Sequence, residues 1–374
     1  MTTSNISEGL RDIKAGKTAI STVGSEGKSL SYRGYDIIEL TEKASFEETA
    51  YLLIYGELPN SSELANYKKR LQSLRSLPAA LKSVLELIPK DAHPMDVMRT
   101  GCSFLGHLEP ETNFSKQFEI ADRMLAVFPS MLNYWYRFTH FSERIDPSKS
   151  EEETLAGFFL ETLLGKKPNE SGRKVIDVSL ILYAEHEFNA STFNSRVAAA
   201  TLSDIYSSIT GGIGTLRGPL HGGANEAAME MLDGFTSVED ANAKVLDLLA
   251  RKVKIMGFGH AVYKISDPRS DIIKSWSKKL AEQCDDSMLY DISCEVERVM
   301  KQEKNMFPNA DFFHASAYRY LDIPTKMFTP LFVCSRISGW IGHVIEQRTD
   351  NKLIRPSAEY IGSGQRPVPV IADR

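Results

Sequence analysis

The sequence predicts a mainly α-helical protein with two or three domains. Hydrophobic side chains recur at helical spacing along most of the chain, and strand-like runs occur only near the N-terminus. A chain of 374 residues holds two or three domains at roughly 100–200 residues each. No repeat of fixed period is present, which disfavours a solenoid.

The first predicted elements are short strands within residues 18–23 and 29–36, where β-forming runs lie next to glycines. A helix follows within residues 44–59. Ser45 and Glu48 form an S-x-x-E capping box at its start, and Gly56 and Pro59 end it. Its apolar face consists of Phe46, Ala50, Leu53 and Ile54.

Helical periodicity continues through the rest of the chain. The segment 327–345 is apolar enough to resemble a membrane span, but Arg336 and His343 interrupt it, so we expect a buried helix. Glycine-rich residues 210–223 are the predicted hinge between domains, and residues 142–153 a surface loop. The other predicted helices lie within residues 61–78, 78–88, 94–106, 118–139, 153–165, 174–188, 195–210, 238–252, 271–284 and 291–304.

Composition excludes several classes of partner. The formal net charge is -5 and no block of five or more basic residues occurs, so we expect no nucleic-acid partner. The four cysteines are far apart and form no C-x-x-C pair, which favours a reduced, cytoplasmic protein. The N-terminal sequence has no apolar stretch typical of secretion, and we expect no membrane association.

A histidine, His221, lies in "RGPLHGGANEAAME", where a helical pattern begins. In the first turn of a helix, the positive end of the dipole opposes protonation and favours a neutral imidazole that donates a hydrogen bond. Gly222 and Gly223 would admit a ligand close to the backbone. The alternative is a capping or hinge histidine with structural glycines.

A second stretch, "KIMGFGHAVYKISDPRS", repeats this design. Gly257 and Gly259 flank Phe258, His260 follows, and Arg269 lies nine residues further on. Two such loops with an arginine downstream indicate a site for an anion or a carbonyl group.

Asp311, in "FPNADFFHASAYRYL", lies at the predicted start of another helix. An aspartate there is ordinarily a capping residue. Together with two neutral histidines, however, its carboxylate suits proton abstraction beside a carbonyl, with the histidines stabilising the charge on oxygen.

Three further cationic candidates, His186, Arg336 and Arg355, lie in apolar surroundings. Buried arginines need anionic partners, and a substrate with two carboxylates would supply them. The alternative is internal pairing with Glu185, Glu187 or Glu346. Patterns for metal hydrolysis, phosphoryl transfer and serine hydrolysis do not occur, so we expect no metal.

Several long motifs in order resemble the citrate synthase family: "SLSYRGYDI", "HPMDVMRTG", "LYAEHEFNAST", "GPLHGGANE", "GFGHAVY" and "IEQRTDNKLIRPSAEY". The resemblance covers nearly the whole chain. It implies an all-α homodimer in which a large domain, residues 1–223 and 319–374, carries a smaller helical domain, residues 224–318, that closes over the substrates.

The resemblance also implies the reaction, in which an acyl-CoA condenses with oxaloacetate and the thioester is then hydrolysed. Coenzyme A is a substrate, and no cofactor is bound permanently. Asp311 would remove the α-proton, His221 would donate to the thioester oxygen, and His260 would protonate the ketone. The implied binding residues are His186, Arg269, Arg336 and Arg355 for oxaloacetate, with Arg355 from a partner subunit, and Lys254, Ile255, Met256, Gly257 and Phe258 for coenzyme A.

Within the family, "HPMDVMRTG", "NASTFNSR" and "RPSAEY" resemble the branch that makes 2-methylcitrate from propionyl-CoA. One methylene is worth only about 1–3 kcal/mol in a pocket, so we expect some use of acetyl-CoA. Ala310 stands where this branch often has leucine, which leaves acyl specificity open. The alternatives are a citrate synthase proper, a non-catalytic helical scaffold and a citrate-cleaving lyase.

Overall fold

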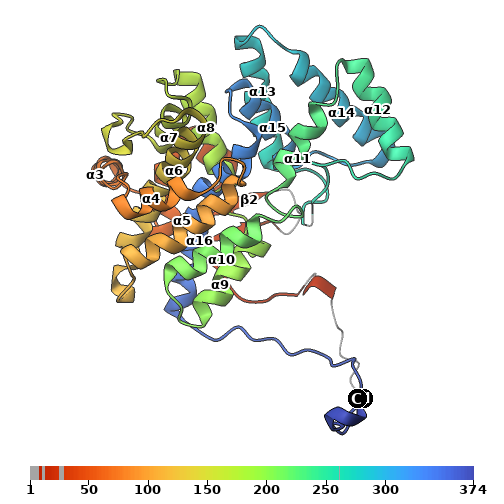
Figure 1. Ribbon diagram of the computed structural model, residues 1–374. Coiled ribbons are helices and arrows are strands. Elements are labelled where there is room, and N and C mark those ends of the chain that lie inside the picture. The colour runs from red at the N-terminus through yellow and green to blue at the C-terminus, as the bar shows by residue number, and fades with distance from the viewer. Residues whose placement is uncertain (1–7, 11–12, 25–28, 261) are drawn as a thin grey trace.

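The computed structural model describes residues 8–10, 13–24, 29–260 and 262–374. These residues form a mostly helical protein with one small sheet, which confirms the predicted fold class (Figure 1). Strands β1 (Ser21–Val23), β2 (Leu30–Tyr32) and β3 (Tyr35–Asp36) make an antiparallel meander in the order β1-β2-β3. All three lie within the two runs in which the sequence predicts strands.

Helix α2 (Phe46–Tyr55) lies in the part of the chain before the predicted hinge. It begins with the Ser45–Glu48 capping box, as predicted. Its first backbone N–H donates to Asp177 of the distant helix α8 over 2.7 Å. The other helices of this part are α1 (Ile37–Lys43), α3 (Ser61–Ser73), α4 (Ala79–Leu87), α5 (Pro94–Leu108), α6 (Gln117–Phe141), α7 (Leu155–Leu164), α8 (Glu170–Tyr183), α9 (Ala190–Ala200) and α10 (Ile205–Leu216).

The long helix α16 (Phe328–Thr349) lies at the centre of this part and contacts α2, α5, α6, α8, α9 and α10. Both of its polar interruptions, Arg336 and His343, are buried. The prediction of a buried helix is therefore confirmed. No helix in the described residues is both long enough and apolar enough to cross a bilayer.

The chain between α9 and α10 corrects one prediction. The periodicity predicts a single helix over residues 195–210, but the helix stops at Ala200 and a new one begins at Ile205. Leu202 takes a left-handed backbone conformation, with φ 64°, which a helix does not accommodate. Asp204 then caps the second helix by accepting from the N–H of Ser207 over 2.9 Å.

Part of the segment predicted as a hinge, residues 210–223, is helical. Gly211, Gly212 and Gly214 lie inside α10, so only the segment after Leu216 is non-helical. A Cβ on Gly212 would lie 2.6 Å from Ser195 Oγ and 3.2 Å from the Trp340 ring. This glycine therefore allows α10 to pack closely on α9 and α16.

Helices α11 (Ala224–Leu232), α12 (Val238–Ala250), α13 (Pro268–Gln283), α14 (Met288–Lys304) and α15 (Ala310–Tyr320) gather on one side of the molecule, at the upper right of Figure 1. They pack mainly against one another, and α13 and α15 also contact α8. The loop between α12 and α13 carries His260 and residues 254–258, half of the predicted site residues, and Arg269 and Asp311 lie at the starts of α13 and α15.

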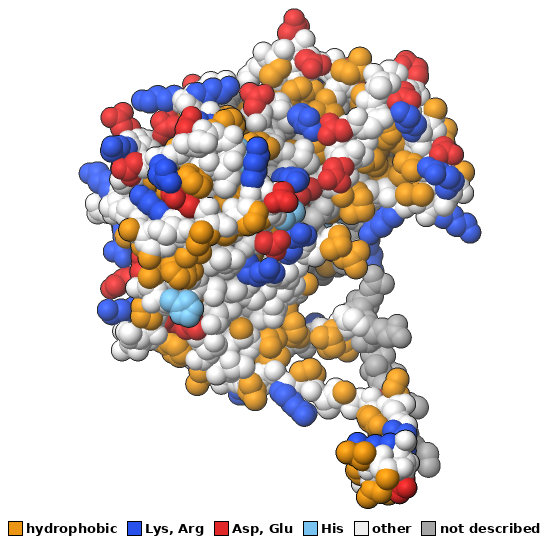
Figure 2. All heavy atoms as spheres, in the orientation of Figure 1, with side chains coloured by type: hydrophobic (Ala, Val, Ile, Leu, Met, Phe, Trp, Pro, Cys, Tyr) orange, Lys and Arg blue, Asp and Glu red, His pale blue; other side chains and the backbone are white. Residues whose placement is uncertain are grey.

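After α16 the chain leaves the helical body as a C-terminal tail, residues 350–374, with one short 3-10 turn, η5 (Ile371–Asp373) (Figure 1). Hydrophobic side chains are exposed along it, and its tip is prominent in Figure 2. They include Leu353, Tyr360, Ile361, Val368, Val370 and Ile371.

Candidate active site

His221 lies in the turn between α10 and α11, three residues before the first residue of α11, Ala224. The turn is closed by the N–H of His221 donating to the Gly218 carbonyl over 2.9 Å. The histidine is thus outside the first helical turn where the sequence pattern placed it. Burial, with a smaller contribution from the Arg336 charge, lowers its pKa to about 3. The predicted neutral imidazole is therefore supported, but by burial more than by a helix dipole.

Ser191 holds the His221 ring. Its hydroxyl lies 2.8 Å and its backbone N–H 3.4 Å from Nε2. Because a backbone N–H can only donate, this contact makes Nε2 the acceptor and leaves the proton of a neutral imidazole on Nδ1. Trp340 Nε1 donates to the same hydroxyl over 3.1 Å. Sequence reasoning missed Ser191, because nothing in the local pattern links it to a histidine thirty residues away.

Two backbone N–H groups determine the tautomer of His260. The N–H groups of Val262 and Tyr263 both donate to Nδ1, over 3.0 and 3.1 Å. A neutral ring therefore carries its proton on Nε2. Burial and the Arg269 charge lower its pKa to about 4. The site thus contains two neutral imidazoles, each with one N–H available to donate.

The loop 254–258 is joined to the start of α15. Gly257 has φ 82°, and its carbonyl accepts from the Asn309 N–H over 2.9 Å. Phe258 pairs with Pro308 in an isolated bridge. Ile255 and Phe258 are buried, Met256 is half-buried, and the Lys254 side chain is exposed. This loop and the helix that carries Asp311 therefore form one unit.

Asp311 is the second residue of α15, and the N-cap of that helix is Asn309, which accepts from the Asp311 N–H over 3.0 Å. The carboxylate of Asp311 is therefore not the helix cap. Its Oδ1 instead accepts a 2.7 Å hydrogen bond from the hydroxyl of Tyr183, at the end of α8. Burial raises the pKa of Asp311 to about 6, and the Tyr183 bond opposes that rise.

His186 and Arg269 lie beside His260. The His186 and His260 ring centroids are 5.0 Å apart, and His186 Nε2 lies 3.1 Å from the Tyr263 hydroxyl. Burial, followed by the charges of Arg269 and His260, holds the pKa of His186 well below its usual value. Arg269 is buried and pairs with Asp267 over 2.8 Å. Asp267 was not among the acidic partners that the sequence suggested.

Arg336 projects from α16 and donates from Nε to the Tyr183 carbonyl over 2.6 Å. Its Nη1 is buried without a hydrogen-bond partner in the described residues. Of the internal partners expected as the alternative, Glu346 pairs with Arg196, and Glu185 pairs with His343 through Oε1. Glu185 Oε2 is buried without a hydrogen-bond partner in the described residues, and its charge stabilises the Arg336 guanidinium, so Arg336 has Glu185 as a nearby counter-charge without a direct ion pair. No ion pair joins Glu187 to Arg336 in the described residues. A buried guanidinium with a free N–H suits an anionic ligand.

The structure brings most of the predicted residues together. The charge of Arg336 acts on His221, His186 and Asp311, and that of Arg269 acts on His186, His260 and Asp311. Arg355 is the exception. It is exposed on the C-terminal tail, which runs away from the body (Figure 1).

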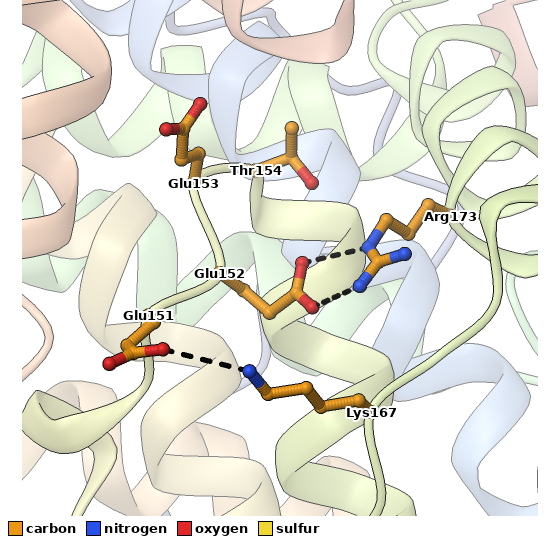
Figure 3. Close-up of a pocket in the computed structure, with 6 residues that line it drawn as sticks. All are labelled: Glu151, Glu152, Glu153, Thr154, Lys167 and Arg173. Atoms are coloured by element: carbon orange, nitrogen blue, oxygen red, sulfur yellow. Dashed lines mark hydrogen bonds and ion pairs between the residues drawn. The ribbon is translucent and has the colours of Figure 1, made fainter.

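Hollows elsewhere on the surface do not include these residues. The one in Figure 3, about 390 Å³, is lined by Glu151, Glu152, Glu153, Thr154, Lys167 and Arg173, and ion pairs join Glu152 to Arg173 and Glu151 to Lys167. Another, of about 400 Å³, lies where α5 meets α10. Over the described ranges, no group of three or more His, Cys, Asp or Glu side chains is arranged to hold a metal ion.

Comparison with known proteins identifies the family. Residues 9–357 match the family described as citrate synthase, C-terminal domain. A 2-methylcitrate synthase from Shewanella oneidensis is 59% identical over 366 residues, 98% of this chain and 97% of that protein. Citrate synthase 2 from Bacillus subtilis is 41% identical and covers 98% of both chains.

Solved structures agree with the sequence matches. The ternary complex of the Thermoplasma acidophilum citrate synthase with carboxymethyl coenzyme A and oxaloacetate superposes with a TM-score of 0.93, at 31% identity and full coverage of both chains. Citrate synthase from Thermotoga maritima gives a TM-score of 0.88 at 38% identity, covering 99% of each chain. By sequence and by fold, this chain belongs to the citrate synthase family.

Proposed function

We propose that this enzyme is a 2-methylcitrate synthase, which condenses propionyl-CoA with oxaloacetate and hydrolyses the thioester to 2-methylcitrate and CoA. The observation that carries this is the 59% identity to the Shewanella oneidensis 2-methylcitrate synthase, against 41% for citrate synthase 2 of Bacillus subtilis. A role in propionate breakdown would follow from that activity, and the four free cysteines support a reduced, cytoplasmic location.

The first step is enolisation. Asp311 takes the proton from the α-carbon of the thioester, and the electron pair of that C–H bond moves toward the carbonyl oxygen. His221 donates its Nδ1 proton as a hydrogen bond to this oxygen and stabilises the developing charge. A pKa of about 6 for Asp311 keeps the base ionised at neutral pH yet basic enough to accept the proton.

Condensation follows at the ketone of oxaloacetate. The enolate carbon attacks the ketone carbon, and the Nε2 proton of His260 passes to the ketone oxygen as the C–C bond forms. The proton that Asp311 removed returns through solvent to His260, which restores both groups. Water then adds its hydroxyl to the thioester carbon, the C–S bond breaks, and CoA leaves as the thiol with the remaining water proton. His260 fits this role because its Nδ1 already accepts from two backbone N–H groups, so the proton faces outward on Nε2.

Two carboxylates of oxaloacetate need cationic or N–H partners. We assign them to His186, Arg269 and Arg336, and the buried Nη1 of Arg336, which has no partner among the described residues, supports that choice. The fourth residue, Arg355, would come from the tail of a second copy in a homodimer. The apolar side chains exposed along the tail support its docking onto another subunit.

For coenzyme A we assign the loop of Lys254, Ile255, Met256, Gly257 and Phe258. With Ile255 and Phe258 buried, its contribution is backbone groups and the exposed Lys254 side chain. The small domain would be residues 224–318, closing against residues 1–223 and 319–374 as the helices after Leu216 move.

The deciding experiment compares kcat/KM for propionyl-CoA and acetyl-CoA with oxaloacetate, following CoA release. A preference for propionyl-CoA of about ten- to one-hundredfold is expected from burying one methylene. A clear preference for acetyl-CoA would make the enzyme a citrate synthase instead. Ala310, buried directly before the base, is the residue we expect to widen the acyl pocket and reduce this preference.

A further inference from the structure

Tyr183, the last residue of α8, is buried and its ring is tightly confined. The ring stacks on Phe332 with centroids 4.1 Å apart and lies 4.2 Å from the ring of His314. His314 is itself fixed, because its Nδ1 lies 2.6 Å from the Ala310 carbonyl and donates to it. The phenol therefore cannot swing away from the start of α15.

The Tyr183 hydroxyl joins two other helices. It donates to Asp311 Oδ1 over 2.7 Å and accepts from Asn225 Nδ2, on α11, over 3.0 Å. An ionised carboxylate can only accept, so the single hydroxyl proton points at Asp311 and the amide must donate to the phenol oxygen. The direction of every hydrogen bond in the chain Asn225–Tyr183–Asp311 is thereby set.

We propose that Tyr183, oriented by Asn225, is a positioning residue for the base: it occupies Oδ1 of Asp311 and so reserves Oδ2 for the α-proton of the thioester. This rests on the proposed function, in which Asp311 is that base. The phenol keeps its own proton throughout.

The α-carbon–hydrogen bond breaks, an O–H bond forms on Oδ2, and the electron pair enters the enolate whose oxygen His221 faces. Burial raises the pKa of Tyr183 well above its usual value, so the phenol does not act as a competing acid. Its hydrogen bond also stabilises the ionised form of Asp311, which lowers the pKa of the base.

The test is the pH dependence of kcat/KM in Tyr183→Phe, which keeps the ring between Phe332 and His314 and removes only the hydroxyl. Losing a hydrogen bond to a charged group should raise the pKa of Asp311. The acidic limb of the profile, the fall in kcat/KM at low pH, should then move upward by about one to two pH units. Activity at pH 7 should fall about two- to tenfold and recover largely at pH 9, with little change in the KM for oxaloacetate. A limb that stays in the wild-type place overturns the proposal.

Asn225→Leu provides a second variant, which also carries the test if Tyr183→Phe fails to fold. Alone it should move the limb upward by less than Tyr183→Phe. Because Asn225 acts only through the phenol, adding it to Tyr183→Phe should move the limb no further. A further shift in the double variant would show that Asn225 acts independently and would contradict the proposed chain.

The matched control is Tyr318→Phe. Tyr318, on α15, is fully buried like Tyr183, but its hydroxyl forms a hydrogen bond with Ser179 and not with Asp311. It should keep the wild-type acidic limb, and a shift equal to that of Tyr183→Phe would mean that any buried hydroxyl lost here has the same effect. Wild-type protein that releases no CoA from either thioester refutes the proposed function; active wild type with an unshifted Tyr183→Phe refutes the positioning role alone.

Discussion

Replacing Asp267 by asparagine tests whether Arg269 faces a carboxylate of the substrate. Asp267 is fully buried and pairs with Arg269 through two contacts, 3.0 Å to Nε and 2.8 Å to Nη2. It also accepts from the Ala310 N–H over 3.0 Å, which ties the pair to the helix of the base. Asparagine keeps the shape and one acceptor oxygen, so the change removes the negative charge and places an amide NH2 where the other carboxylate oxygen accepts from N–H groups.

The size of the effect follows from leaving Arg269 as an uncompensated buried cation. Breaking one partner of a buried ion pair costs about 3–5 kcal/mol. An unfolding entropy of about 2.1 cal/mol/K per residue gives a chain of 374 residues about 0.8 kcal/mol/K. The melting temperature of Asp267→Asn should therefore fall by about 4–6 °C.

Thermal melts with and without oxaloacetate provide the assay. A ligand that binds only the folded state raises its stability, and a dicarboxylate would also supply the charge that Asp267→Asn lacks. At equal oxaloacetate concentration, the melting temperature of Asp267→Asn should therefore rise by more than that of wild type. An equal or smaller rise would refute the placement of Arg269 at the substrate.

The control for this experiment is Asp247→Asn. Asp247, on α12, pairs with Arg251, the C-cap residue of that helix, and both side chains are more than half exposed. Exposed pairs of this kind contribute about 0.3–0.5 kcal/mol, so the melting temperature should change by less than about 1 °C. A drop comparable to that of Asp267→Asn would mean that the buried pair has no special role.

Three other predictions rest on the same geometry. Asp311→Asn should lower kcat by about 10²–10⁴-fold while calorimetry still detects oxaloacetate binding, and unchanged turnover would remove the assigned base. In wild type, kcat/KM should fall as the pH drops through about 6, because Asp311 must be ionised to act as the base. His221 and His260, with pKa values of about 3 and 4, stay neutral over that range. A fall in kcat/KM only near pH 4 would mean that a histidine, and not Asp311, is the group that titrates. Gly257→Ala should raise the KM for acyl-CoA and lower the melting temperature, because φ is 82° and a Cβ would lie 2.9 Å from the Phe312 side chain. Gly214→Ala, inside α10 with its nearest neighbour 4.0 Å away, is the control and should leave both unchanged or stabilise the fold.

Local patterns predicted the elements because their causes lie within a few residues. The Ser45–Glu48 capping box joins groups three positions apart, and each strand near the N-terminus pairs with the next strand in the sequence. The break between α9 and α10 had a local signal too, Asp204 before Ser207, but the helical periodicity on both sides obscured it. The burial of α16 was also predictable, because two polar residues within a long apolar run favour a protein interior over a membrane.

By itself, the sequence determined the helical class, the N-terminal strands and the presence of His221, His260 and Asp311 beside glycines or at a helix start. Only the tertiary structure decided which groups hold them. Tyr183 lies 128 positions from Asp311 in the sequence, and Ser191 lies 30 from His221, yet each makes a direct hydrogen bond. Such contacts depend on how α8, α9, α11 and α15 pack. Helical spacing reports only the apolar face of each helix and carries no information about which distant residue will face it.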